Sequence, residues 1–238
     1  MAKPFRQTFV EHLDELRGRL VKSIAAVLLA ATVVYGYTDT LLLAMIKPVG
    51  YVVFTSLADA FVAKITLSLY MGLLVTLPFV LYQLWQFVAI ALKEEERKYI
   101  AYYGPFSLVM FLMGASFGYF VLVPMSAQFL IGFSSDVVVP MITIKNYISF
   151  VVTMLLAAGV IFELPLVLMF LTKIGVATPE FLIQKRRHAI VLILIISAVI
   201  TPPDVITLLI MSGPLLILYE IGIVISKITY QQKLRLES

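Results

Sequence analysis

Long apolar segments separated by short charged clusters dominate the pattern of this 238-residue chain. About 20 consecutive apolar residues in a helix cross the hydrocarbon core of a bilayer, which is about 30 Å thick. Six segments of this kind are predicted to be transmembrane spans, at about residues 20–38, 65–92, 100–131, 146–172, 189–202 and 205–226. The pattern therefore predicts an all-α, polytopic membrane protein with a single integral membrane domain.

The last two spans are predicted to be short. The uncharged stretches 189–203 and 205–219 contain 15 residues each, and a helix of that length covers only about 22 Å. Pro202 and Pro203, followed by Asp204, must break the helix between them. Two short spans that thin the bilayer, or one re-entrant hairpin, would both explain this pattern, and we favour two short spans.

An amphipathic helix over about residues 5–19 precedes the first span. Phe9, Leu13 and Leu16 recur at helical spacing, so this helix is expected to lie in the headgroup region and to lead into the membrane. Glu15 falls on a polar side of the helix, where it can pair with Arg19 one turn later.

The distribution of lysine and arginine predicts the orientation. If the N-terminus is cytoplasmic, 15 of the 18 basic residues lie on the cytoplasmic side, and only Lys47, Lys64 and Lys145 lie outside. Cytoplasmic loops carry such an excess of positive charge. With six spans, both termini are therefore expected to be cytoplasmic.

The composition excludes several kinds of chemistry. The chain is 61% hydrophobic and 13% charged, and it contains no cysteine and two histidines that are far apart. No glycine-rich phosphate loop, His-Glu-x-x-His zinc motif or serine with a histidine base within a span is present, so we expect no cofactor, no metal and no enzymatic activity. No basic stripe with interleaved aromatic residues is present either, and nucleic-acid binding is not expected.

Glu163 is the first candidate for a functional site. It is the only charged residue between Lys145 and Lys173, in the middle of the fourth predicted span, and Pro165 after it predicts a kink. An ionisable group near the centre of a span costs about 2.5–3.5 kcal/mol on insertion scales, so it should face other helices or a wet cavity. The alternative is a packing carboxylate that accepts a hydrogen bond from a neighbouring Ser, Thr or Tyr.

Five motifs in order along the chain resemble those of the TatC family, the multispanning core of the twin-arginine protein translocase. The resemblance covers nearly the whole length. The motifs are His12-Leu13-x-Glu15-Leu16-Arg17; Pro48; Leu81-Tyr82-Gln83-Leu84-Trp85-Gln86-Phe87 with Glu96-Arg97 after it; Phe162-Glu163-Leu164-Pro165; and Thr201-Pro202-Pro203-Asp204. One departure is that Glu94 and Glu95 precede Glu96, which leaves open which of these carboxylates binds.

The resemblance implies a receptor for signal peptides that carry two adjacent arginines on folded cargo, exported at the expense of the proton gradient. Glu15 and Glu96, with Glu95, match the recognition positions, while Arg17 and Phe87 are expected to shape the same surface. A carboxylate suits the planar fork of arginine better than the ammonium of lysine. The expected location is the cytoplasmic (inner) membrane of a prokaryote.

The resemblance also implies partners. Single-span subunits, TatA and TatB, are expected to dock against the two final spans and near Glu163, and self-association is expected in the full complex. Pro48, Pro202, Pro203 and Asp204 are interpreted as structural positions at the outer face. Glu220 is expected to snorkel to the interface or to pair with Lys227.

Two other functions remain open from the residues alone. A proton-coupled small-molecule transporter that uses Glu163 would need at least a second intramembrane charge, for which Glu220 is a weak candidate. A membrane scaffold subunit would tolerate loss of Glu15 and Glu96 without loss of cargo recognition.

Overall fold

The computed structural model describes residues 9–90, 100–135, 139–201 and 204–237, which are predominantly helical. A π-helical turn, η1 (Gly118–Leu122), joins α5 to α6. The helices are α1 (Phe9–Tyr35), α2 (Thr38–Met45), α3 (Asp59–Ile90), α5 (Ile100–Phe117), α6 (Val123–Ile131), α7 (Ile144–Phe162), α8 (Leu164–Lys173), α9 (Pro179–Gln184), α10 (Arg186–Ile200) and α11 (Val205–Glu237). The predicted all-α class is confirmed.

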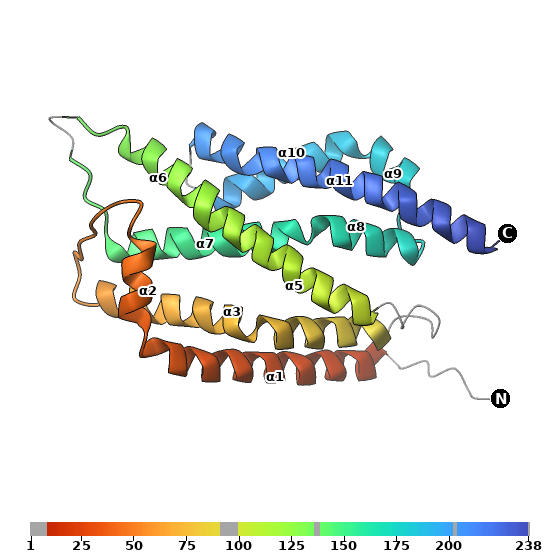
Figure 1. The fold of residues 1–238 in the computed structure, drawn as a ribbon, viewed down its shortest axis with the longest axis horizontal. Coiled ribbons are helices and arrows are strands. Elements are labelled where there is room, and N and C mark those ends of the chain that lie inside the picture. The colour runs from red at the N-terminus through yellow and green to blue at the C-terminus, as the bar shows by residue number, and fades with distance from the viewer. Residues whose placement is uncertain (1–8, 91–99, 136–138, 202–203, 238) are drawn as a thin grey trace.

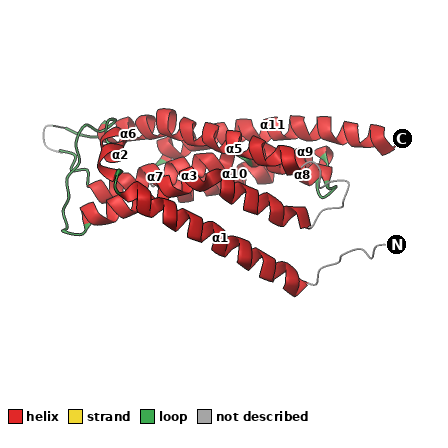
Figure 2. Cartoon of the chain, turned by 60° about the horizontal axis from the view of Figure 1, so that its bottom comes forward, coloured by secondary structure: helices red, strands yellow, loops and turns green. Residues whose placement is uncertain are grey.

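The long helices run roughly alongside one another and form a bundle (Figure 1). Helix α1 packs along α3, α3 packs on α5 and α7, α5 packs on α7, and α11 packs on α8 and α10. The start of α1 and the end of α11 lie at the same end of the bundle, which we call the terminal end (Figures 1 and 2). Helix α2 and the start of α7 lie at the opposite end, which we call the loop end.

Five helical stretches in the described part of the chain are long and apolar enough to cross a bilayer. They are His12–Tyr35, Asp59–Ile90, Tyr102–Ile131, Ile144–Lys173 and Val205–Gln232. They correspond to the first four predicted spans and to the last one. The remaining predicted span, 189–202, corresponds to α10, whose 15 residues cover about 22 Å. The chain is thus a polytopic helical membrane protein. The last stretch, Val205–Gln232, has 28 residues, so the prediction of a short final span is wrong for this helix.

Two boundaries differ from the sequence-based expectation. The amphipathic segment and the first span form one continuous helix, α1, of 27 residues rather than two elements. The last helix, α11, has 33 residues and continues well past the predicted end at 226. In both cases charged residues mark where a span meets water, but they do not stop a helix, because Glu, Lys and Arg are good helix formers.

Proline explains two irregularities within the spans. The fourth span is interrupted at Glu163, between α7 and α8, because Pro165 has no N–H to donate to the preceding turn. The predicted kink is confirmed. Likewise Pro124 follows the π-helical turn, where its missing N–H allows the helix to widen.

The interior of the bundle is packed with aliphatic side chains, and its outside is apolar as well. Leu67, Ile148, Met154, Met211 and Ile223 are almost completely buried where α3, α7 and α11 meet. A second buried cluster, beside Glu163, contains residues from α3, α5 and α8: Leu77, Leu81, Trp85, Ala89, Tyr103, Phe111, Ala115 and Leu166. Leu29, Val33, Phe120 and Val199 are strongly exposed on the outside. This distribution suits a protein whose outer surface is covered by lipid tails, which are as apolar as leucine.

Candidate functional site

Residues at matching spacings on α1 and α3 face each other near the terminal end. On α1 they are His12, Glu15 and Arg19, and on α3 they are Gln83 and Phe87. Spacings of three and four residues place side chains on one face of a helix, so each set forms a short row. We call these five residues the α1–α3 seam.

Glu15 and Arg19 form the charged part of the seam. Arg19 Nη2 and Nε donate to Glu15 Oε1 at 2.6 and 3.1 Å, and Arg19 Nη1 donates to Gln83 Oε1 at 3.1 Å. The predicted pair between Glu15 and Arg19 is confirmed. The side chains of Arg19 and Glu15 are 21% and 27% exposed, so the pair is partly desolvated and accessible from one side.

The aromatic part of the seam lies one turn closer to the start of α1. The rings of His12 and Phe87 stack with centroids 4.4 Å apart and an interplanar angle of 22°. This contact holds α1 against α3 beside the carboxylate of Glu15. Phe87 therefore lies where it contributes to the same surface as Glu15.

The other predicted recognition residues are not part of this cluster. Arg17 lies two residues from Glu15, on a different side of α1, and is exposed. Glu95 and Glu96 lie outside the described residues. The helix ends that flank them, Ile90 and Ile100, lie at the terminal end, the same end as the seam.

Glu163 lines a cleft of about 190 Å³ between α3, α5 and α8. Ser107 Oγ on α5 donates to Glu163 Oε1 at 2.8 Å, which is the contact expected under the alternative interpretation of Glu163 as a packing carboxylate. Trp85 also lines the cleft, and its buried indole N–H has no hydrogen-bond partner among the described residues. The remaining lining is apolar: Leu81, Leu84, Val88, Val167 and Phe170. A carboxylate at the break in the span thus borders an apolar opening, where it can meet a polar group that enters from the bilayer.

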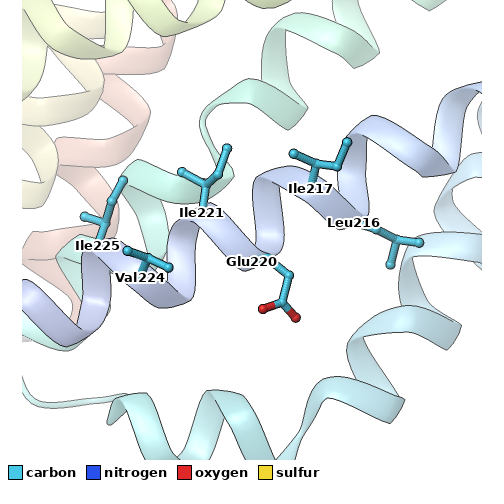
Figure 3. Close-up of a pocket in the computed structure, with 6 residues that line it drawn as sticks. All are labelled: Leu216, Ile217, Glu220, Ile221, Val224 and Ile225. Carbon is cyan, nitrogen blue, oxygen red and sulfur yellow. The ribbon is translucent and has the colours of Figure 1, made fainter.

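A second apolar groove, of about 480 Å³, lies along α11 (Figure 3). It is lined by Leu216, Ile217, Glu220, Ile221, Val224 and Ile225, and Glu220 points to a different side of the helix from Ile217 and Ile221. Arg186 Nη2 at the start of α10 donates to Glu220 Oε2 at 2.6 Å. The expected pairing of Glu220 with Lys227 is wrong, because α10 is so short that its first residue lies at the level of Glu220.

Two of the predicted structural positions, Pro48 and Asp204, are among the described residues. Pro48 is in the tight turn after α2, in which Gly50 has a φ of +79° and its N–H donates to the carbonyl of Ile46 at 3.0 Å. Asp204 caps α11: its carboxylate accepts from the N–H of Thr207 at 2.7 Å and from the Thr207 hydroxyl at 2.5 Å. Pro202 and Pro203 lie outside the described residues.

The sequence pattern predicts no specific contact for Gln83, Ser107 or Arg186. Gln83 and Ser107 are polar residues within otherwise apolar spans, and that was the available signal. Arg186 is one of the basic residues on the predicted cytoplasmic side. Its partner, 34 residues away, is set by the packing of α10 on α11.

Comparisons with known proteins agree with this architecture. The family model for the Sec-independent protein translocase protein TatC matches residues 11–214. The chain is 38% identical over 225 residues to the Sec-independent protein translocase protein TatC of Carboxydothermus hydrogenoformans, covering 92% of this chain and 93% of the relative. It is also 38% identical over 235 residues to TatC of Desulforapulum autotrophicum, covering 96% of this chain and 87% of the relative.

A solved structure is similar over almost its whole length. The crystal structure described as the twin arginine translocase receptor TatC superposes with a TM-score of 0.83 at 35% identity, covering 92% of this chain and 99% of that chain. The chain therefore belongs to the TatC family, the multi-pass membrane proteins of the twin-arginine, Sec-independent protein translocase.

Proposed function

We propose that this chain is the signal-peptide receptor and core subunit of its translocase, and that it reads the arginine pair of a signal peptide at the terminal end. The observation that carries the proposal is the environment of Glu15. Its carboxylate already accepts two N–H bonds from a guanidinium, so its surroundings are compatible with an arginine fork. A signal peptide would offer the same group.

A pair of arginines calls for a second acidic residue. In this proposal Glu96, or its neighbour Glu95, receives the second arginine, while Arg17 and Phe87 shape the surrounding surface. The positions of the helix ends that flank residues 91–99 support it, because they lie at the same end of the bundle as Glu15. The family resemblance of the motifs supports it as well.

The chain is proposed to reside in the cytoplasmic (inner) membrane of a prokaryote. Its terminal end is proposed to face the cytoplasm. The excess of basic residues predicted for that side and the location of both chain ends at one end of the bundle support this orientation. The proton gradient is the proposed energy source.

Single-span subunits of the TatA and TatB type are proposed to dock on the groove along α11 and at the cleft of Glu163. Both openings have apolar linings with one carboxylate each, Glu220 and Glu163. Such a lining fits an apolar membrane helix that carries a polar side chain. An interhelical hydrogen bond of this kind contributes roughly 0.6–2 kcal/mol in lipid. Self-association of the chain in the full complex is proposed on the family resemblance alone.

Binding of a labelled signal peptide to the purified protein in detergent tests the receptor role. We expect the Arg-Arg peptide to bind and its Lys-Lys form to bind much more weakly, because lysine cannot reproduce the bidentate geometry. The Glu15→Ala/Glu96→Ala double variant should lose the preference for arginine. Equal binding of both peptides to the natural protein would refute the proposal.

Co-purification with single-span partners tests the docking sites. Glu163→Gln keeps hydrogen-bonding capacity and should co-purify with the partner as the natural protein does. Glu163→Ala should co-purify with less of the partner. Exposed Lys22→Gln on α1, which lines neither opening, is the control for a general effect on expression. Retention of all partners by Glu163→Ala would refute docking at the cleft.

A further inference from the structure

Arg19 occupies the position that an incoming guanidinium would need. Its guanidinium donates three hydrogen bonds to two acceptors: Nε and Nη2 donate to Glu15, and Nη1 donates to Gln83. Gln83 is 8% exposed and belongs to α3, so the guanidinium is bound to both helices of the seam. In this state the protein already contains an arginine bound to its own proposed reading residue.

Arg19 and a peptide arginine are chemically equivalent ligands for Glu15, but they do not compete on equal terms. Arg19 is on the same helix, one turn away, so its contact with Glu15 involves no loss of translational and rotational freedom. Binding of a separate peptide does involve that loss. Replacement of Arg19 by one peptide arginine exchanges one charge-assisted pair for another and breaks the bond to Gln83. A ligand with a single arginine therefore gains little, and a ligand must contribute further interactions to displace Arg19.

We propose that Arg19 is a resident guanidinium that competes for Glu15 and so lowers the affinity of every ligand whose arginine binds there. This inference rests on the proposed function, in which Glu15 binds an arginine of the signal peptide. Gln83 acts as a latch, because its carbonyl oxygen accepts from the third donor of Arg19. A ligand with a second arginine has a further contact that offsets the loss of affinity caused by this competition.

Equilibrium binding of four labelled peptides to the full chain in detergent tests the inference. The peptides carry Arg-Arg, Arg-Lys, Lys-Arg or Lys-Lys and are otherwise identical. In Arg19→Gln the single-arginine peptides should gain at least about tenfold in affinity, the order expected for release of a charge-assisted hydrogen bond. The Arg-Arg peptide should gain by a similar factor. The Lys-Lys peptide, which has no guanidinium for Glu15, should gain less, so that the ratio of the Arg-Arg affinity to the Lys-Lys affinity widens.

Matched variants separate competition from a change of charge. Lys22→Gln removes one positive charge from an exposed position three residues further along α1 and should leave the ratio unchanged. Gln83→Leu removes the latch but keeps Arg19, and it should widen the ratio of the Arg-Arg affinity to the Lys-Lys affinity less than Arg19→Gln does. Arg19→Lys keeps the charge without the fork and should act in the same direction, which preserves the test if Arg19→Gln does not fold.

Two results would overturn the inference. A loss of Arg-Arg affinity in Arg19→Gln would mean that Arg19 positions Glu15 for the ligand instead of competing with it. An unchanged ratio in Arg19→Gln and Arg19→Lys would mean that Arg19 only joins α1 to α3. A Glu15→Gln variant separates these outcomes from failure of the proposed function. If Arg-Arg binding survives Glu15→Gln, Glu15 does not bind the arginine and the proposed function itself is wrong.

Discussion

The contact between α1 and α3, which carries the seam, depends on glycine at position 72. A Cβ atom at Gly72 would lie 2.7 Å from the backbone nitrogen and 2.9 Å from the Cα atom of Ala31. Backbone atoms cannot rotate away as a side chain does, so Gly72→Ala must push α1 away from α3. Overpacking of this kind costs about 1–3 kcal/mol, and the higher helix propensity of alanine offsets at most about 1 kcal/mol of it. We expect a net loss of about 1–2 kcal/mol in the free energy of unfolding.

Thermal unfolding in detergent measures this loss, with the fluorescence of the single tryptophan, the buried Trp85, as the signal. For a chain of this size, 1–2 kcal/mol corresponds to a Tm lower by about 2–8 °C. Gly18→Ala in α1 is the matched control, because no atom beyond its chain neighbours and its own helix backbone lies within 4 Å of the added Cβ. It should leave Tm unchanged or raise it slightly. If Gly72→Ala melts at or above the natural protein while Gly18→Ala behaves as expected, α1 is not held by this close approach and the reasoning is wrong.

Three further perturbations test other parts of the bundle. Asp204→Ala removes the cap of α11 and should cost about 0.5–2 kcal/mol; Asp204→Asn should recover most of it in the same melting experiment. Thr172 and Ser226 join α8 to α11 through hydroxyl groups 2.6 Å apart in a buried contact. Ser226→Ala should therefore destabilise by about 0.6–2 kcal/mol, and an unchanged Tm would show that the bond is dispensable. The exposed pair of Arg186 and Glu220 should contribute only about 0.2–1 kcal/mol in a double-mutant cycle, and a coupling energy well above that would contradict its description as an exposed pair.

The class of the protein and most of its spans follow from the length and spacing of the apolar segments alone. The bilayer imposes a fixed thickness and requires internal hydrogen bonding of the backbone, so the length of an uncharged segment suffices to identify a membrane helix. The kink at Pro165 and the pair of Glu15 with Arg19 were also predictable, since both depend on residues within one turn of each other. The recognition motifs identified the family, because their order along the chain is specific.

Which distant side chains meet depends on how the helices pack against one another. The partner of Glu220 is Arg186 and not the nearer Lys227, because the short α10 brings its first residue to the level of Glu220. Gln83 reaches Arg19, and Phe87 stacks on His12, because Gly72 allows α1 and α3 to approach closely. Helical periodicity determines which face a residue occupies, but contacts between helices depend on their relative height and rotation, and side-chain packing across the whole bundle sets these.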